Sequence, residues 1–157
     1  MTGGQALVKS LYREGVRVVF GITGVQLYHA TDALYDEPGI RFITTRHEQG
    51  AAYMAYGYSW VGGGIGTALV VPGPGLFNAL AGVGTAYSAS APMLLVSGQI
   101  PKDSIGLNRG ELHEVDDQLD AVKTVTKWAC RVLDAADIPS AVHEAFYHLN
   151  TGRPRPA

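Results

Sequence analysis

Short apolar runs alternate along this chain with stretches of helical spacing. Runs rich in β-branched residues predict buried strands over residues 16–20, 40–43, 67–71, 92–96 and 125–128. Apolar positions three and four residues apart predict helices over residues 6–12, 26–35, 76–87, 114–122 and 138–149, with one more beginning near Glu48. Because strands alternate with helices and each strand is apolar throughout, we expect an α/β fold of three layers, in which a doubly wound parallel sheet has helices on both faces.

One carboxylate, Glu48, stands where the strand over residues 40–43 gives way to a helix. Four small residues follow it, at positions 50, 51, 52 and 55, and small residues let another backbone approach closely. Ligands of an open parallel sheet bind beyond the carboxyl ends of its strands, so Glu48 is a candidate for chemistry. Thr45 and Glu48 also fit a capping box, in which Thr45 caps the helix and Glu48 reaches back to a backbone amide. Spacing alone favours the capping box, and the catalytic interpretation stays open.

The composition narrows the classes of function. The 157 residues are 46% hydrophobic and 17% charged, as in an ordinary globular domain. A net charge of −2 without a basic run gives no electrostatic footprint for nucleic acid or for an anionic membrane, and no apolar run reaches the roughly eighteen residues of a membrane span. The single Cys130 excludes an internal disulfide and favours a cytoplasmic location. The spacing of the histidines suggests no metal site.

A family resemblance extends over essentially the whole chain. Residues 46–52 resemble the RHEQGAA segment in the pyrimidine-binding domain of thiamine-diphosphate-dependent enzymes of the acetolactate synthase and benzaldehyde lyase type. Five further segments agree in the same order: Thr2-Gly3-Gly4, Val19-Phe20-Gly21, Pro72-Gly73-Pro74-Gly75 with Asn78, Ser97-Gly98-Gln99, and Val125-Thr126-Lys127-Trp128. Residues 152–157 are similar to a corner that leads into one more strand in the family. We therefore expect residues 1–157 to be the N-terminal pyrimidine-binding domain, as a fragment of a longer three-domain chain.

The resemblance implies thiamine diphosphate as the cofactor. Glu48 takes the place of the carboxyl group that bonds N1′ of the aminopyrimidine, favouring the imino tautomer whose nitrogen removes the thiazolium C2 proton. Pro72, Gly73, Pro74 and Asn78 match the corner that closes against this ring, although Pro72 replaces the usual Ser or Ala and lacks a backbone donor. A Gly-Pro-Gly turn at a helix start also offers free amides to an anion or a ring, and simple turn geometry accounts for the motif equally well.

Two residues fall on the substrate side of the implied site. Gln26 stands where benzaldehyde lyase-like enzymes carry a substrate-facing His, and His113 stands where many relatives carry a Gln near the reactive carbon. A histidine there can shuttle protons near neutral pH, and a solvated loop histidine is the open alternative. Residues 111–121 also resemble the oxalyl-CoA decarboxylase and 2-hydroxyacyl-CoA lyase branch. The substrate classes therefore stay open among 2-keto acids, 2-hydroxy ketones and acyl-CoA thioesters.

The other half of the implied site has no counterpart in the sequence. The family holds the diphosphate through Mg²⁺ on a separate domain with a GDG motif, and no Gly-Asp-Gly occurs here. We expect that half to come from the diphosphate-binding domain of a neighbouring subunit, in a homodimer or homotetramer. Two alternatives stay open. The chain is a stand-alone subunit that pairs with a separate diphosphate-binding chain, or it is a non-catalytic doubly wound dimerisation module in which Glu48 is only a cap.

Overall fold

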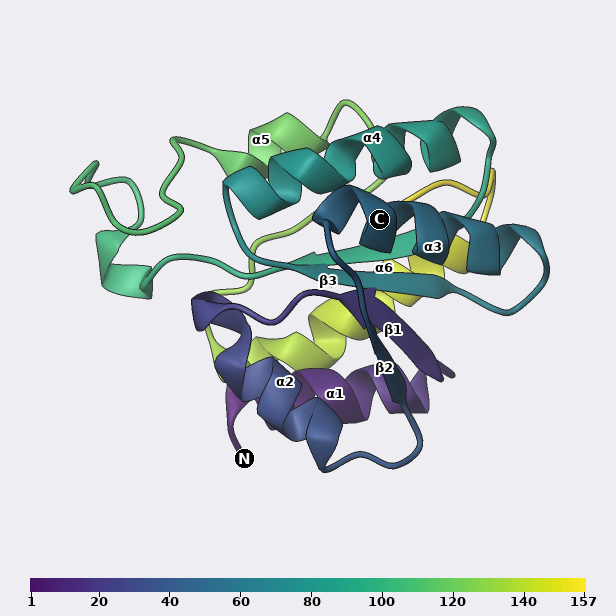
Figure 1. Ribbon diagram of the computed structural model, residues 1–157, viewed down its shortest axis with the longest axis horizontal. Helices are drawn as coiled ribbons and strands as arrows, with labels where there is room; N and C mark the ends of the chain where they lie inside the picture. Colours follow the sequence, from purple (N-terminus) through teal and green to yellow (C-terminus); the bar gives the residue numbers. More distant parts are fainter.

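Four parallel strands form the central sheet of the computed structural model, which describes all 157 residues (Figure 1). The strands lie in the order β2-β1-β3-β4. Their bounds are Val18–Gly21 for β1, Arg41–Thr44 for β2, Gly66–Val70 for β3 and Met93–Ser97 for β4. The helices are α1 (Gly3–Arg13), α2 (Tyr28–Tyr35), α3 (Glu48–Trp60), α4 (Pro74–Ser88), α5 (Gln118–Val122) and α6 (Ile138–Asn150), and the 3₁₀ turns are η1 (Val25–Leu27), η2 (Lys102–Ser104) and η3 (Ala135–Asp137). None of these helices combines the length and the apolar character needed to pass through a membrane.

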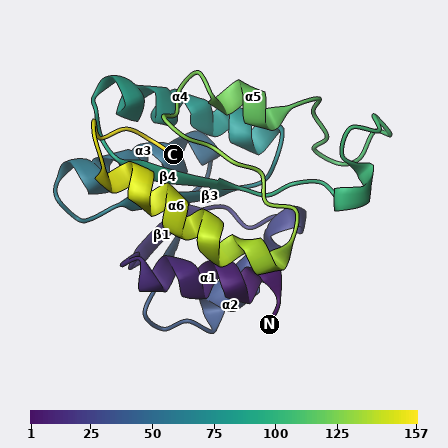
Figure 2. The ribbon, with the colours of Figure 1, turned by 180° about the vertical axis from the view of Figure 1, so that it is seen from behind.

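The sheet separates two apolar cores. Val19 and Leu69 belong to the core shared with α1, α2 and α6, whereas their neighbours Phe20 and Ala68 belong to the core shared with α3 and α4. This alternation follows from the pleat, which directs successive side chains to opposite faces. Figures 1 and 2 show α1, α2 and α6 on one face and α3 and α4 on the other. The predicted three-layer, doubly wound parallel sheet is confirmed.

The direction in which the chain crosses the sheet reverses between β1 and β3. β2 lies on one side of β1, and β3 lies on the other. The helix that follows β1, α2, and the helix that follows β3, α4, consequently cover opposite faces (Figure 1). The connection from β1 to α2 and the connection from β3 to α4 therefore leave the carboxyl ends of these strands toward opposite faces of the sheet. Such a switch point is the usual place for a ligand in an open α/β sheet.

Small residues bring α3 close to its neighbours. A Cβ on Gly82 of α4 would lie 2.7 Å from the Cβ of Ala52 and 2.9 Å from the carbonyl carbon of Ala52. A Cβ on Gly66, at the start of β3, would lie 1.9 Å from the carbonyl oxygen of Ala55. Neither contact is possible for a real side chain, so glycine is required at both places. The position of α3 against β3 and α4, and with it that of Glu48, is fixed by backbone contact.

The strand predicted over residues 40–43 is found one residue later as β2, but it is not buried. It pairs only with β1, at the edge of the sheet, and Arg41 and Thr44 are exposed. Phe42 and Ile43 are half-buried. The prediction of a buried strand is wrong because an apolar run does not reveal whether a strand will have a neighbour on one side or on both.

Two predictions for the second half of the chain are also wrong. Residues 125–128 form no strand, and the Lys127 amide bonds at 2.9 Å to the carbonyl oxygen of Pro156, which lies outside the four strands. The helix predicted over residues 114–122 begins only at Gln118, because the Asp117 side chain accepts bonds from two amides of the first turn and so ends the preceding loop. Ala157 itself lies along β4, with its amide bonded to the Met93 carbonyl oxygen at 3.0 Å.

Candidate active site

Glu48 is the first residue of α3 and is not part of a capping box. The cap is His47, whose Nδ1 accepts a bond from the amide of Gln49 at 3.2 Å. The Thr45 hydroxyl donates to the carbonyl oxygens of Gly21 and His47 instead of accepting from the helix. The capping-box interpretation is therefore wrong, because the helix begins three residues after Thr45 and the Glu48 side chain is free of its own backbone.

The Glu48 carboxylate is held from one side only. Its Oε2 accepts a hydrogen bond of 3.0 Å from Nδ2 of Asn78 on α4. Its Oε1 has no hydrogen-bond partner in the chain, and a Cβ built on Gly75 would lie 3.4 Å from it. The carboxylate is half-buried at the carboxyl edge of the sheet. One oxygen is thus fixed by an amide, and the other is available to a group outside the chain.

The predicted corner at residues 72–75 joins β3 to α4 beside this carboxylate. Gly73 has φ +57° and ψ −115°, and a Cβ there would lie 2.4 Å from the carbonyl oxygen of His113. Pro72 is fully buried, whereas Pro74 is exposed in the first turn of α4. The two glycines of the corner therefore lie in close contact with other parts of the chain: Gly73 borders the loop after β4, and Gly75 borders Glu48.

The expectation that this corner offers free amides is wrong for both glycines. The Gly73 amide donates to Oε1 of Gln118 at 3.2 Å, and the Gly75 amide donates to the Pro72 carbonyl oxygen at 3.4 Å. Gln118 also donates through Nε2 to the carbonyl oxygen of Gly98 at 2.9 Å, so one side chain ties the corner to the end of β4. No sequence signal identified Gln118, because its two partners are backbone groups 45 and 20 residues away.

The structure brings the two substrate-side candidates into contact. Gln26 lies in η1, directly after β1, and His113 lies in the loop after β4. Nδ1 of His113 is 3.0 Å from Oε1 of Gln26, and Nε2 of Gln26 donates to the carbonyl oxygen of Leu112 at 2.9 Å. His113 has φ +69°, a left-handed conformation that is uncommon for a residue with a side chain. Since its carbonyl oxygen faces Gly73, the Gln26–His113 pair and the Glu48–Asn78 pair border the same glycine corner.

Asp117 anchors the end of the loop that carries His113. Its carboxylate accepts from the amides of Asp120 and Leu119 and from the Arg131 guanidinium, the last at 2.7 Å. The bond from the Asp120 amide, together with those from Leu119 and Arg131, keeps the pKa of Asp117 below its ordinary value. This carboxylate fixes the start of α5 and with it the position of Gln118.

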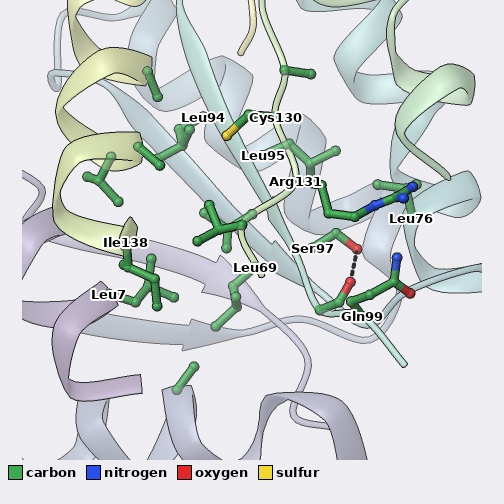
Figure 3. A pocket seen from close by; sticks show the side chains of 18 of the residues that line it. Leu7, Leu69, Leu76, Leu94, Leu95, Ser97, Gln99, Cys130, Arg131 and Ile138 are labelled. Carbon is green, nitrogen blue, oxygen red and sulfur yellow. Dashed lines mark hydrogen bonds between the residues drawn. The ribbon is translucent and has the colours of Figure 1, made fainter. Parts of the chain in front are cut away.

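A cavity of about 390 Å³ lies on the face of the sheet covered by α1 and α6 (Figure 3). Gln26 and Gln118 are among the residues that line it, whereas Asn78 and His113 are not. Its lining is mostly apolar, with Leu7, Leu94 and Ile138 around it and Cys130 and Arg131 at its rim. Burial raises the pKa of the Cys130 thiol. Glu48 does not line this cavity, and no three His, Cys, Asp or Glu side chains in the chain lie close enough together to hold a metal ion.

Comparisons with known proteins show the family to which the chain belongs. Residues 1–121 match the family described as "Thiamine pyrophosphate enzyme, N-terminal TPP binding domain". The chain is 41% identical over 156 residues to the acetolactate synthase large subunit of Haemophilus influenzae, covering 99% of this chain and 27% of that protein. It is 39% identical to a probable 2-ketoarginine decarboxylase of Pseudomonas aeruginosa and 36% identical to the acetolactate synthase isozyme 3 large subunit of Escherichia coli, again over 99% of this chain and over 28% and 27% of those proteins. The chain thus spans about a quarter of the length of these relatives. By the match over residues 1–121, it belongs to the thiamine pyrophosphate enzymes, as a member of their N-terminal TPP binding domain family.

Proposed function

We propose that this chain is the pyrimidine-binding half of a thiamine-diphosphate-dependent active site, in an enzyme that makes or breaks a carbon–carbon bond. The observation that carries the proposal is the geometry of Glu48, with one carboxylate oxygen held by Asn78 and the other without a partner beside Gly75. The alternative of a non-catalytic dimerisation module relied on Glu48 as a helix cap. It loses that support, because the cap is His47.

The residues present fit an aminopyrimidine ring. A carboxyl group can share a proton with a ring nitrogen, and the unpartnered Oε1 of Glu48 is available for that bond. At Gly73 and Gly75 the space of a Cβ is taken by the His113 carbonyl oxygen and by Val71, so the two glycines let the loop after β4 and Val71 pack closely around the corner beside Glu48. When bound, thiamine diphosphate supplies a thiazolium carbon that adds to a carbonyl group and takes up the electrons of the broken bond.

Each residue of the chain then has a defined task. Glu48 holds a proton at the ring nitrogen, and Asn78 orients the carboxylate by donating to Oε2. The Gly73 corner, with Pro74 exposed on it and Pro72 buried beneath it, is the surface against which the ring packs. On the other side of that corner, His113 and Gln26 face the substrate, and His113 moves protons. The substrate classes are 2-keto acids, 2-hydroxy ketones and acyl-CoA thioesters, in line with relatives named acetolactate synthase and 2-ketoarginine decarboxylase.

The diphosphate and Mg²⁺ are held by a second domain, which we place on a neighbouring subunit of a homodimer or homotetramer. The outer face of α3 supports this arrangement. Gly50 and Gly57 would place a Cβ in open space, and Tyr53, Met54 and Trp60 on the same helix are exposed, Trp60 to 61%. Two helical glycines without an internal reason cost stability in the isolated chain, and an approaching partner backbone would explain them. A separate diphosphate-binding chain in place of a domain of a longer three-domain protein would use the same face.

Exchange of the cofactor C2 proton tests the proposal. The chain, paired with a diphosphate-binding domain, is loaded with thiamine diphosphate and Mg²⁺, and loss of the C2 proton signal in deuterated solvent is followed by quenched-flow NMR. We expect Glu48→Gln to slow exchange by about 10²-fold or more, the usual contribution of a positioned acid or base. The control is Glu144→Gln on α6, on the opposite face of the sheet, which should change nothing. Unchanged exchange in Glu48→Gln would remove the catalytic assignment while leaving the fold intact.

A further inference from the structure

We propose that Gln26 is a positioning residue that fixes the tautomer of His113, placing the ring proton on Nδ1 and leaving Nε2 as the proton acceptor. The tautomer follows from hydrogen-bond geometry alone. Its use in catalysis rests on the proposed function, in which His113 moves protons on the substrate side of the Gly73 corner. Neither the family match nor the names of the relatives assigns a tautomer or a partner to this histidine.

The orientation of the Gln26 amide is set first. Its nitrogen lies 2.9 Å from the carbonyl oxygen of Leu112, which can only accept a hydrogen bond. The NH₂ group must therefore face Leu112, because a flipped amide would place two carbonyl oxygens against each other. With the nitrogen directed to Leu112, the remaining atom, Oε1, faces His113.

The tautomer of His113 follows from that orientation. Oε1 of Gln26 lies 3.0 Å from Nδ1 of His113, and an amide oxygen has no proton to donate. Nδ1 must carry the hydrogen of this bond. A neutral imidazole has one N–H, so Nε2 has none and presents its lone pair. Nε2 has no hydrogen-bond partner in the chain, which leaves it open to a substrate group.

The backbone of the loop after β4 holds the ring in place. Oε2 of Glu114 accepts from the amides of Gly110 and Glu111, at 2.6 and 2.9 Å, which closes a turn around His113. His113 is in the left-handed region, and its carbonyl oxygen occupies the space that a side chain on Gly73 would need. The ring is thus fixed at its backbone and at Nδ1, so Nε2 is its only nitrogen without a partner in the chain.

A neutral Nε2 suits a substrate that carries a hydroxyl group beside its carbonyl group, such as a 2-hydroxy ketone. Nε2 takes the hydroxyl proton as the O–H bond breaks, and the electron pair stays on the oxygen for use in carbon–carbon cleavage. In the imidazolium that results, Nδ1–H still donates its hydrogen bond to the Gln26 oxygen, and this bond stabilises the positive charge. On cleavage this oxygen becomes the carbonyl oxygen of one product, and the imidazolium gives its proton to the carbon that is left with the electron pair of the broken bond. In the direction of bond formation the proton returns to the oxygen, so no external acid or oxidant is needed.

Histidine NMR on the ¹⁵N-labelled chain tests the tautomer directly. Above the titration of the histidines, long-range ¹⁵N–¹H correlations distinguish a protonated from an unprotonated ring nitrogen, and the signals missing in His113→Gln assign His113 among the five histidines. We expect the Nδ1–H form in the wild-type chain. Gln26→Ala should shift His113 toward the Nε2–H form, whereas Gln26→Glu should keep Nδ1–H because a carboxylate also accepts. Gln99→Ala, in the same region but without contact to His113, is the matched control.

Each outcome bears on one claim. An Nε2–H form in the wild-type chain, or an unchanged tautomer in Gln26→Ala, would overturn the assignment of Gln26 whether or not Glu48 activates a cofactor. In the assembled enzyme, Gln26→Ala should lower kcat for a 2-hydroxy ketone by about 10²-fold, the scale of a general base, while C2 exchange stays at the wild-type rate. If C2 exchange proves independent of Glu48 but the tautomer is as expected, the proposed function fails and the positioning by Gln26 stands.

Discussion

Replacing Gly82 with alanine tests whether backbone contact sets the spacing of α3 and α4. The new Cβ would lie 2.7 Å from the Cβ of Ala52, and ordinary contacts begin near 3.4 Å, so the helices must separate by about 0.7 Å. Overpacking of this kind costs about 1–3 kcal/mol. Alanine also improves helix propensity by up to about 1 kcal/mol. We expect overpacking to win, with a net loss of about 2 kcal/mol, because two of the atoms in contact are backbone atoms that cannot rotate away.

Gly57→Ala, in the middle of α3, is the matched control. No atom lies within 4 Å of the Cβ it would add, so only the helix propensity remains, and we expect a gain of about 0.4–1 kcal/mol. Urea unfolding followed by circular dichroism measures both variants, and the m-value should not change. In thermal unfolding the two should differ by about 5–12 °C in Tm, at about 2–4 °C per kcal/mol. A Gly82→Ala chain as stable as Gly57→Ala would refute the argument that glycine sets this spacing.

Three further predictions concern the site. Asn78→Ala should slow C2 exchange by about tenfold or more, since a hydrogen bond to a charged group contributes about 1.5–3 kcal/mol and here it orients the Glu48 carboxylate; quenched-flow NMR measures it. Asp117→Asn should make the loss of stability in acid less steep. The folded pKa of Asp117 is below its ordinary value of 3.8, so the stability that its carboxylate contributes is present above pH 3.8 and is lost as the pH falls through the folded pKa. Urea titrations between about pH 2 and 5 would show this, and an unchanged slope would contradict it. Gln118→Ala leaves the Gly73 amide unpaired and should lower the free energy of unfolding by about 1–2 kcal/mol, whereas an unaffected chain would show that the corner holds itself.

The sequence predicted the class of fold because the pattern and the structure have the same cause. The apolar run predicted as a strand is buried on both faces from residue 67 to Val70, where β3 ends, and the stripe that includes Leu76, Ala79 and Val83 is buried in α4. Residues that are buried on one face of a helix or strand recur at a regular spacing, and that spacing can be read from the sequence. The edge position of β2 has no such signature, since it depends on which strands come to lie beside it.

The sequence predicted the residues of the candidate site one by one, but it did not predict how they are arranged in space. Spacing alone favoured a cap for Glu48, and the structure removed that interpretation by starting the helix three residues after Thr45. The contacts that organise the site join distant positions, such as Gln26 with His113, 87 residues apart, and Gly73 with Gln118. Long-range side-chain contacts follow from the tertiary packing, so neither periodicity nor local propensity could have indicated them.

The proposed site has two parts, one on each side of the Gly73 corner, and they come from different elements of the fold. Glu48 and Asn78 are mounted on α3 and α4, whose spacing is set by backbone, whereas Gln26 and His113 come from a short turn and a surface loop. In the proposed function, substitutions on the loop side change the choice of reaction while the residues on α3 and α4 stay as they are. The same division offers protein engineers a place to vary selectivity while keeping cofactor activation constant.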